Sequence, residues 1–251
     1  MKILLSPTKT MKASNITLNQ AATIPFFQSK ASYIHSFLET WSLSDLKKRM
    51  KLSDNLAIKS LKEIEEWNNE ESKHPSVLYY SGTAFKSMQP AKWSKDEISF
   101  AQERLLILSA LYGVLSPYDL ISPYRLEMGI THSFLPGYGN LYAYWKSFIT
   151  TYLNDISPNS PIINLASKEY MDVVNHHDLN ANLINCHFLE NKNGSLKVIG
   201  NYAKSARGLM TNFIITNKIS NVEGVKLFKS NGYVHDTQRS DENNLYFIRK
   251  H

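Results

Sequence analysis

The chain has 251 residues, of which 43% are hydrophobic, and a formal net charge of +6. This apolar content is sufficient for a large core and excludes a disordered chain, and no run approaches the roughly 18 apolar residues of a membrane span. The single cysteine, Cys186, excludes an internal disulfide and a thiolate-based zinc or iron–sulfur site. We expect a monomeric, cytoplasmic protein without membrane contact and without a cofactor, in which the Cys186 thiol is structural.

The predicted elements begin with a short buried strand over Lys2–Leu5. A helical subregion follows at about residues 29–67. Its first helix, Ser29–Thr40, is indicated by apolar residues at three- and four-residue spacing, which are Tyr33, Ile34, Phe37, Leu38 and Trp41. Two more helices are predicted over Leu43–Met50 and Asn55–Trp67, the second with Ser53 as its N-cap.

The central part of the chain contains two predicted strands with a helix between them. The first strand is Val77–Tyr80. Ser94-Lys95-Asp96-Glu97 then forms a capping box that starts a helix running to about Arg104. Leu105–Ala110 is predicted as a buried strand because its apolar run has no helical stripe.

The C-terminal half adds further strands and a helix without any repeat, low-complexity segment or linker. The predicted elements are a strand over Ile162–Leu165, a hairpin of Leu183–Glu190 and Leu196–Gly200 around Asn193-Gly194, a helix over Ser205–Asn217, and strands over Val225–Phe228, Tyr233–His235 and Leu245–Arg249. This order of elements predicts a single mixed α/β domain over residues 1–251, with the helical subregion inserted into it.

The positive charge is concentrated in two stretches. Residues 191–222 contain no acidic residue, and their cations are Lys192, Lys197, Lys204, Arg207 and Lys218. The second stretch consists of Lys47, Lys48, Arg49 and Lys51. Either stretch alone is typical of a solvated face. Two of them in a protein with a pI near 9.1 favour a polyanionic partner, because neutralising phosphates releases counterions.

Several catalytic and metal motifs are incomplete. Ser6-Pro7-Thr8-Lys9 matches the S-x-x-K of serine penicillin-recognising hydrolases, and Ser53-Asp54-Asn55 supplies an S-D-N, but no K-T-G follows. His176 and His177 are adjacent, and neighbouring side chains on an extended chain point to opposite sides, so we predict a solvated loop and no metal site there. The chain has no P-loop, G-x-G-x-x-G or G-x-S-x-G.

Prolines, aromatic residues and charged residues follow the predicted strand Leu105–Ala110. This stretch includes Tyr112, Arg125 and Glu127, and strand ends of this kind are where α/β proteins usually place sites. The alternative is a packed loop held by an Arg125–Glu127 pair.

Four segments carry a family resemblance. "SPTKT" at 6–10, "LSALYGVLSPYDLISPYRLEMG" at 108–129, "NLASKEY" at 164–170 and "YAKSARGLM" at 202–210 resemble the YaaA peroxide-stress protein family in order and spacing. The resemblance implies a cytosolic bacterial protein that limits peroxide damage and keeps unincorporated iron low. It also implies the compact α/β cantaloupe fold, with a helix-hairpin-helix element, a positively charged cleft and affinity for DNA. No reaction is assigned to the family.

Two segments compete as the DNA-binding hairpin. "LPGYG" at 135–139 matches a helix-hairpin-helix turn, but no Lys or Arg lies between Gly129 and Trp145, and the resemblance includes "NLYAYW" at 140–145 but not this segment. We expect a loop that leads to Asn140 as an N-cap. The alternative hairpin is "KLSDNLA" at 51–57, which lacks the two glycines but lies beside four cations. A plain packed helix pair is an equally open interpretation of it.

We therefore expect a DNA-binding protein of the peroxide stress response that contacts duplex phosphates with little sequence preference. The predicted DNA-binding residues are Lys47, Lys48, Arg49, Lys51, Ser53, Lys204 and Arg207. The alternative is an enzyme of unassigned reaction acting on an anionic or nucleic-acid ligand. Its candidate pocket residues are Ser6, Lys9, Tyr112, Arg125, Glu127, Lys168, Lys204 and Arg207. If the predicted strands run parallel, their C-terminal ends bring these residues to one edge of the sheet.

Overall fold

The N-terminal strand β1 (Lys2–Leu5) lies in the middle of the main sheet of the computed structural model, which describes residues 1–13, 21–130 and 132–250. The strand order is β4-β3-β1-β6-β7-β11-β10-β9, and β8 pairs with β7. β1 runs parallel to both neighbours, with Ile3 opposite Leu105 of β3 and Ile163 of β6. The mixed α/β fold predicted from the sequence is confirmed.

The bounds of the elements are as follows. The strands are β1 (Lys2–Leu5), β2 (His74–Pro75), β3 (Leu105–Ser109), β4 (Gly113–Leu115), β5 (Leu120–Ile121), β6 (Ile162–Leu165), β7 (Leu183–Lys192), β8 (Ser195–Lys197), β9 (Lys229–Ser230), β10 (Tyr233–His235) and β11 (Asn244–Lys250). The helices are α1 (Gln28–Leu38), α2 (Leu43–Met50), α3 (Asp54–Glu65), α4 (Ser76–Tyr79), α5 (Thr83–Met88), α6 (Lys95–Arg104), α7 (Leu141–Ile156), α8 (Lys168–Met171), α9 (Gly200–Thr216) and α10 (Val222–Lys226), with short 3-10 turns at Glu70–Ser72 and Pro90–Lys92.

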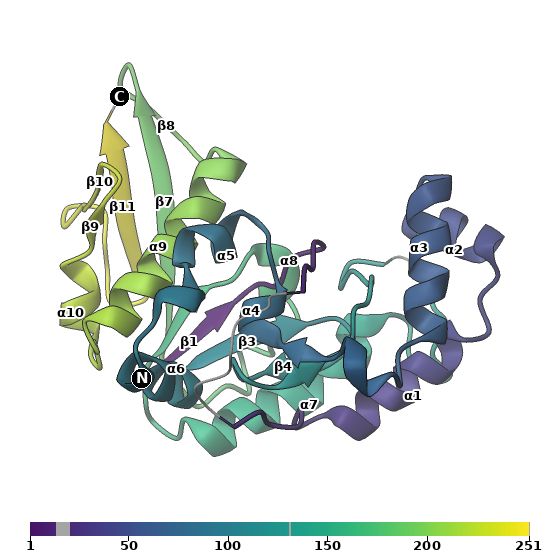
Figure 1. Ribbon diagram of the computed structural model, residues 1–251. Coiled ribbons are helices and arrows are strands. Elements are labelled where there is room, and N and C mark those ends of the chain that lie inside the picture. The colour runs from purple at the N-terminus through teal and green to yellow at the C-terminus, as the bar shows by residue number, and fades with distance from the viewer. Residues whose placement is uncertain (14–20, 131, 251) are drawn as a thin grey trace.

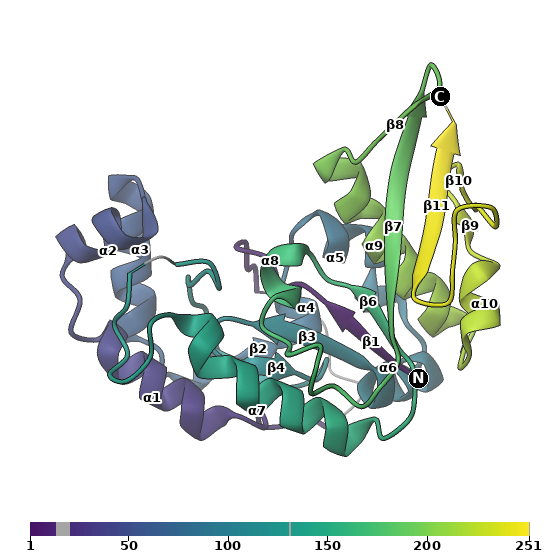
Figure 2. The same ribbon diagram turned by 180° about the vertical axis from the view of Figure 1, so that it is seen from behind.

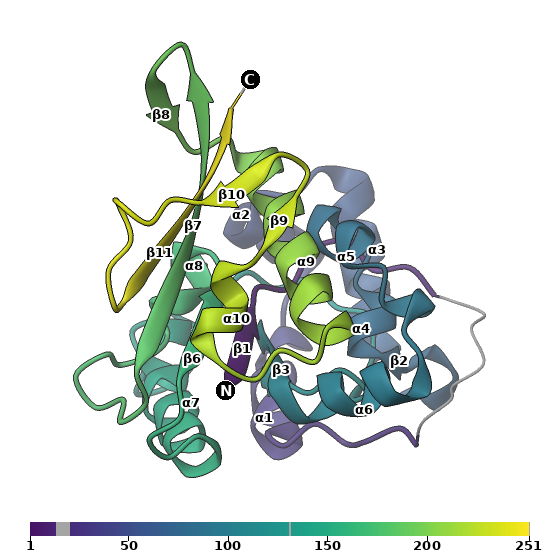
Figure 3. The same cartoon turned by 90° about the vertical axis from the view of Figure 1, so that its left-hand side faces the viewer.

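Helices cover both faces of the parallel part of the sheet. Figure 3 shows α9 and α6 on one side of β1, β6 and β7, and α7 on the other. This coverage explains why β3 and β6 are buried at every position, since strands covered on both faces show no alternation of buried and exposed residues. α1 lies along α7 at the base of the molecule, where Tyr33 stacks on Tyr144 with ring centroids 6.0 Å apart (Figure 2).

Two parts of the chain project from the sheet on opposite sides (Figure 1). One is the β7–β8 hairpin, whose turn is made by Asn193 and Gly194, both with positive φ as a tight hairpin requires. The other is the helix pair α2–α3. A capping box between Ser42 and Asp45 starts α2, and Lys51 ends it in the left-handed conformation with φ of 53°. Leu52 is buried in the turn that follows.

Two predicted strands are helices. Val77–Tyr80 falls in α4, where the Ser76 and Val77 backbone N–H groups donate to the carbonyls of Asp119 and Pro117 and the segment turns instead of joining the sheet. Of the predicted strand Val225–Phe228, the first two residues fall in α10 and none joins the sheet, because the Asn221 side chain caps the Gly224 N–H and starts a helical turn. Both segments are too short for their apolar pattern to separate strand from helix.

The other predicted elements are present with shifted ends. The β1, β6 and α2 predictions match the observed bounds, and α9 begins at Gly200 rather than Ser205. Asn140 caps α7 by accepting a hydrogen bond from the Ala143 N–H, as predicted. The segment before it is a loop in which Gly137 has a φ of 79°.

Candidate functional site

A cavity of about 350 Å³ lies at the C-terminal end of β1. At this point the chain order of the parallel strands reverses, since β3 lies on one side of β1 and β6 on the other, and such crevices are the usual ligand sites of α/β sheets. Four segments line the cavity. Its lining includes Ser6, Thr8, Lys9 and Thr10 after β1, Gly82, Thr83 and Ala84 at the start of α5, Ser167, Glu169 and Tyr170 after β6, and Lys204 and Arg207 on α9.

Hydroxyl groups join the ends of β1 and β6 at the cavity wall. The Ser6 hydroxyl accepts a hydrogen bond from the Ser167 backbone N–H at 2.8 Å and donates to the Ser167 Oγ at 3.2 Å. The Lys9 Nζ is engaged elsewhere, since it lies 2.7 Å from the Glu127 carboxylate. Ser6 and Lys9 therefore both line the cavity, but they do not form the activated serine that the S-x-x-K spelling suggested.

Two glycines allow the cavity segments to approach closely. A Cβ atom on Gly82 would lie 2.1 Å from the Thr8 Oγ1, so the loop after β1 packs directly on the start of α5. A Cβ atom on Gly208 would lie 1.9 Å from the Ala84 carbonyl oxygen, where α5 crosses α9. Gly208 directly follows Arg207 in α9. The close crossing of α5 and α9 at Gly208 therefore holds the backbone from which the Arg207 side chain reaches the cavity.

The charged groups are distributed unevenly around the cavity. Lys204 is exposed at its edge, whereas Arg207 is half-buried and its Nε has no hydrogen-bond partner among the described residues. Burial lowers the pKa of Arg207. Lys9 and Glu127 form the ion pair at the rim, with 55% and 30% of their side chains exposed. A second, smaller cavity of about 140 Å³ joins Glu127 to Arg49, Met50 and Lys51.

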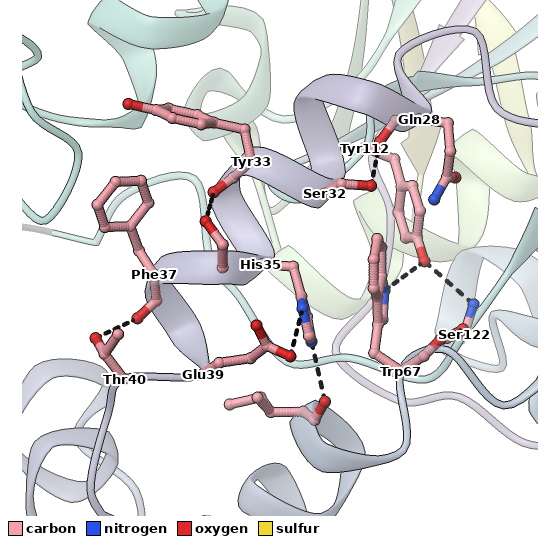
Figure 4. Close-up of polar contacts among 12 residues, drawn as sticks. Gln28, Ser32, Tyr33, His35, Phe37, Glu39, Thr40, Trp67, Tyr112 and Ser122 are labelled. Carbon is pink, nitrogen blue, oxygen red and sulfur yellow. Dashed lines mark hydrogen bonds and ion pairs between the residues drawn. The ribbon is translucent and has the colours of Figure 1, made fainter.

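Four predicted pocket residues do not line the strand-end cavity. Glu127 lines the smaller cavity and reaches the rim only through its ion pair with Lys9, and the other three are Tyr112, Arg125 and Lys168. Tyr112 is buried on the other side of its loop, where its hydroxyl accepts hydrogen bonds from the Trp67 Nε1 at 2.9 Å and the Ser122 N–H at 3.2 Å (Figure 4). Burial raises the pKa of this tyrosine, so it stays a neutral structural group. Arg125 is half-buried and lies near Glu63, where its charge partly offsets the rise in the pKa of Glu63 that burial causes. Lys168 points to solvent and binds Asp172 at 2.8 Å.

The sequence did not indicate three groups of the cavity wall. Gly82, Thr83 and Ala84 were missed because the preceding segment was predicted as a strand, although Ser81-Gly82-Thr83 is a plausible helix start. Glu169 accepts a hydrogen bond from the Gly129 N–H at 3.4 Å, and burial raises the pKa of Tyr170 well above its usual value. Both follow Lys168 in the family-like segment 164–170.

The described residues contain no group of three or more His, Cys, Asp or Glu side chains arranged to hold a metal ion. His176 and His177 lie in the loop between α8 and β7. Within the same ranges, the helices are all too short or too polar to cross a membrane.

The sequence matches the family described as "Peroxide stress protein YaaA" over residues 1–239. The chain belongs to this family. A UPF0246 protein of Aliivibrio fischeri strain MJ11 is 39% identical to it, over all of this chain and 98% of the relative. UPF0246 proteins of Rickettsia conorii and of Crocosphaera subtropica are each 37% identical, over 99% of this chain and the whole of the relatives. The predicted family is confirmed, and membership supports a role in peroxide stress.

Proposed function

We propose that the protein is a cytoplasmic, monomeric duplex DNA-binding protein of the peroxide stress response. It contacts phosphates along the backbone with little preference for base sequence. We also propose that the protein limits free iron in the cell. The observation that carries the proposal is the turn between α2 and α3, which presents a helix N-terminus beside exposed cations.

The backbone of this turn has the features that phosphate binding requires. Lys51 adopts the left-handed conformation for which a hairpin normally uses glycine, and Leu52 packs inward. α3 has 12 residues, and the Ser53 side chain makes no capping hydrogen bond to its first turn. The N-terminal N–H groups and the helix dipole therefore favour an anion at this position.

The lysines around the turn are not equivalent. Lys47 forms an ion pair with Asp54, and Arg49 lies 3.5 Å from Asp45. Lys48 and Lys51 are exposed, and neither forms an ion pair within the ranges that the structure describes. Lys48 and Lys51 are the cations most available to phosphates, and Ser53 lies next to them at the start of α3.

Cations on α9 and the β7–β8 hairpin extend this positive surface. Figure 1 shows the helix pair α2–α3 and the start of α9 on the two sides of the loop that follows β1. Lys204 is exposed on α9, Arg207 is half-buried one turn later, and Lys192 and Lys197 are exposed on the hairpin. A duplex contacting both sides would engage several phosphates, which is the source of affinity without sequence specificity.

The experiment measures binding of a closed circular duplex to the intact protein as a function of salt. The double variant Lys48→Ala/Lys51→Ala should weaken affinity by roughly 10- to 100-fold near 0.1 M salt and reduce the slope of log affinity against log salt by about 2. A matched control is Lys59→Ala/Lys62→Ala, which removes two lysines further along α3 that are paired with Glu63 and Glu66. This control should leave the slope nearly unchanged.

The segment 135–139, whose sequence matches a helix-hairpin-helix turn, provides a second control. Gly137→Ala/Gly139→Ala should leave DNA binding unchanged, with a loss of stability arising from the positive φ at Gly137. DNA binding that does not depend on salt would overturn the proposal. So would loss of binding in Gly137→Ala/Gly139→Ala together with unchanged binding in Lys48→Ala/Lys51→Ala. Competition by unrelated duplex sequences should be nearly equal.

A further inference from the structure

Arg207 is a cation in the cavity wall without a matching negative charge. Its guanidinium is half-buried, its Nε is inaccessible to solvent, and no described residue accepts a hydrogen bond from that nitrogen or forms an ion pair with it. A charge that is partly removed from water is destabilising unless an opposite charge or hydrogen-bond partner balances it. Such a group is retained where an external anion supplies the missing charge.

The nearby groups do not supply this charge. The Cys186 thiol lies close enough to be influenced by Arg207, but burial raises the pKa of the thiol to about 12 and keeps it neutral. Glu127 is paired with Lys9 at 2.7 Å. Glu169 lines the same cavity and accepts a hydrogen bond from the Gly129 N–H, but within the ranges that the structure describes it forms no ion pair with Arg207.

The other groups of the cavity suit a phosphate group. Lys204 lies three residues before Arg207, on the same face of α9, and both line the cavity. Hydroxyl-bearing residues line it from three other segments, at Ser6, Thr8, Thr10, Thr83 and Ser167. A guanidinium binds two oxygens in a fixed fork, and the ammonium and hydroxyl groups can serve a third.

The cavity also has room for more than an inorganic ion. Its volume of about 350 Å³ falls in the range of small-molecule sites, and Leu5, Pro7 and Leu165 provide an apolar part of the wall. Glu169 lines the same cavity, and Glu127 lies at its rim on Lys9, so a second phosphate following directly on the first would approach carboxylates. The arrangement favours a terminal phosphate over a phosphodiester inside a strand.

We propose that the strand-end cavity binds a terminal phosphate monoester carried by a nucleoside-sized body, with Arg207 and Lys204 holding the phosphate. Two sources share this chemistry, a free mononucleotide and the phosphorylated end of a DNA strand. Only the second source rests on the DNA-binding function proposed above.

The test is titration calorimetry of the full chain with a deoxynucleoside monophosphate, the corresponding nucleoside and inorganic phosphate. The monophosphate should bind at least tenfold more tightly than either of the others. Arg207→Gln should reduce that affinity at least tenfold, Arg207→Lys should give an intermediate loss, and Lys204→Gln a smaller one. Lys168→Gln is the matched control, since this lysine follows β6 at the same edge but binds Asp172 outside the cavity.

Two further measurements separate the possible failures. Arg207→Gln removes an unpaired charge, so its thermal unfolding without ligand should occur no lower than that of the unchanged protein. Lys48→Ala/Lys51→Ala should lose circular duplex and keep mononucleotide binding, which distinguishes failure of the cavity from failure of the DNA-binding proposal. Short duplexes that end in a 5′-phosphate or a 5′-hydroxyl then identify the source of the phosphate. If the 5′-phosphate increases duplex affinity and this increase requires Arg207, the ligand is a strand end. If the 5′-phosphate has no effect on duplex affinity, the ligand is the free nucleotide. No phosphate-dependent binding of the mononucleotide, or binding unaffected by Arg207→Gln, overturns the inference.

Discussion

The Gly208→Ala substitution tests whether the crossing of α5 and α9 holds the strand-end cavity in shape. The added Cβ would lie 1.9 Å from the Ala84 carbonyl oxygen, whereas ordinary contact begins at 3.4 Å. The helices would therefore have to separate by about 1.5 Å, and Arg207, the preceding residue, would move with α9.

Two effects oppose each other in this substitution. Alanine is more favourable than glycine in a helix interior by about 1 kcal/mol. An extra carbon in a close-packed contact costs about 1–3 kcal/mol, and here the obstacle is backbone, which cannot rotate away as a side chain can. We expect the steric effect to dominate. The free energy of unfolding should fall by up to about 2 kcal/mol, which lowers Tm by up to roughly 8 °C for a chain of this size.

The measurement is thermal unfolding followed by far-UV circular dichroism, with Gly200→Ala as the control. Gly200 lies in the same helix, its Cβ would meet nothing within 4 Å, and its φ is not positive. The control should melt at or above the temperature of the unchanged protein. If Gly208→Ala melts as high as Gly200→Ala, the close crossing does not constrain the fold and the argument is refuted.

Three other predictions concern single side chains. Cys186 is buried with its pKa raised to about 12, so a thiol reagent at neutral pH should label it only as fast as the protein unfolds, and rapid labelling of the native protein would contradict its structural role. Burial lowers the pKa of His35 in the folded state, so as the pH drops below about 6.5 the unfolded state binds a proton before the folded state does, and stability should fall. His35→Gln should reduce this loss of stability at low pH. An unchanged dependence of stability on pH in this variant would contradict the prediction. Glu127→Gln should cost at most about 1 kcal/mol in urea unfolding, because the Glu127–Lys9 pair is partly exposed, and a larger loss would make Glu127 a structural support.

The sequence predicted the elements whose patterns are local and unambiguous. β1 and β6 are short apolar runs next to polar strand ends, and both were placed correctly. The capping box at Ser94 and the N-cap at Asn140 fixed two helix starts, since side-chain caps are set by neighbours in the sequence. Val77–Tyr80 was wrong because its backbone partners lie about 40 residues away, after β4.

The candidate site, like the fold, was predictable only where its residues are placed by nearby sequence. Ser6, Lys9, Lys204 and Arg207 line one cavity, as expected. The parallel strand β1 delivers Ser6 and Lys9 to the edge of the sheet, whereas Lys204 and Arg207 come from α9, which follows the antiparallel β7–β8 hairpin. Tyr112 was expected there too, but which way a loop side chain points depends on its packing partners. Here Trp67, from the far end of α3, provides the donor that turns the Tyr112 hydroxyl away from the cavity.

The pairing of Glu127 shows why charge partners are the hardest part of a site to predict. Arg125 is two residues away and was the expected partner, yet Glu127 binds Lys9, which is 118 positions earlier in the chain. The segment 122–127 is not a regular strand, and Arg125 lies near Glu63 while Glu127 lies beside α2 with Arg49 and Lys51. One carboxylate thus lies between the cations of the helix pair and the rim of the strand-end cavity. A phosphate at the helix pair would lie near Glu127, and the ion pair with Lys9 connects this carboxylate to the rim of the strand-end cavity, so Glu127 lies between the two proposed sites.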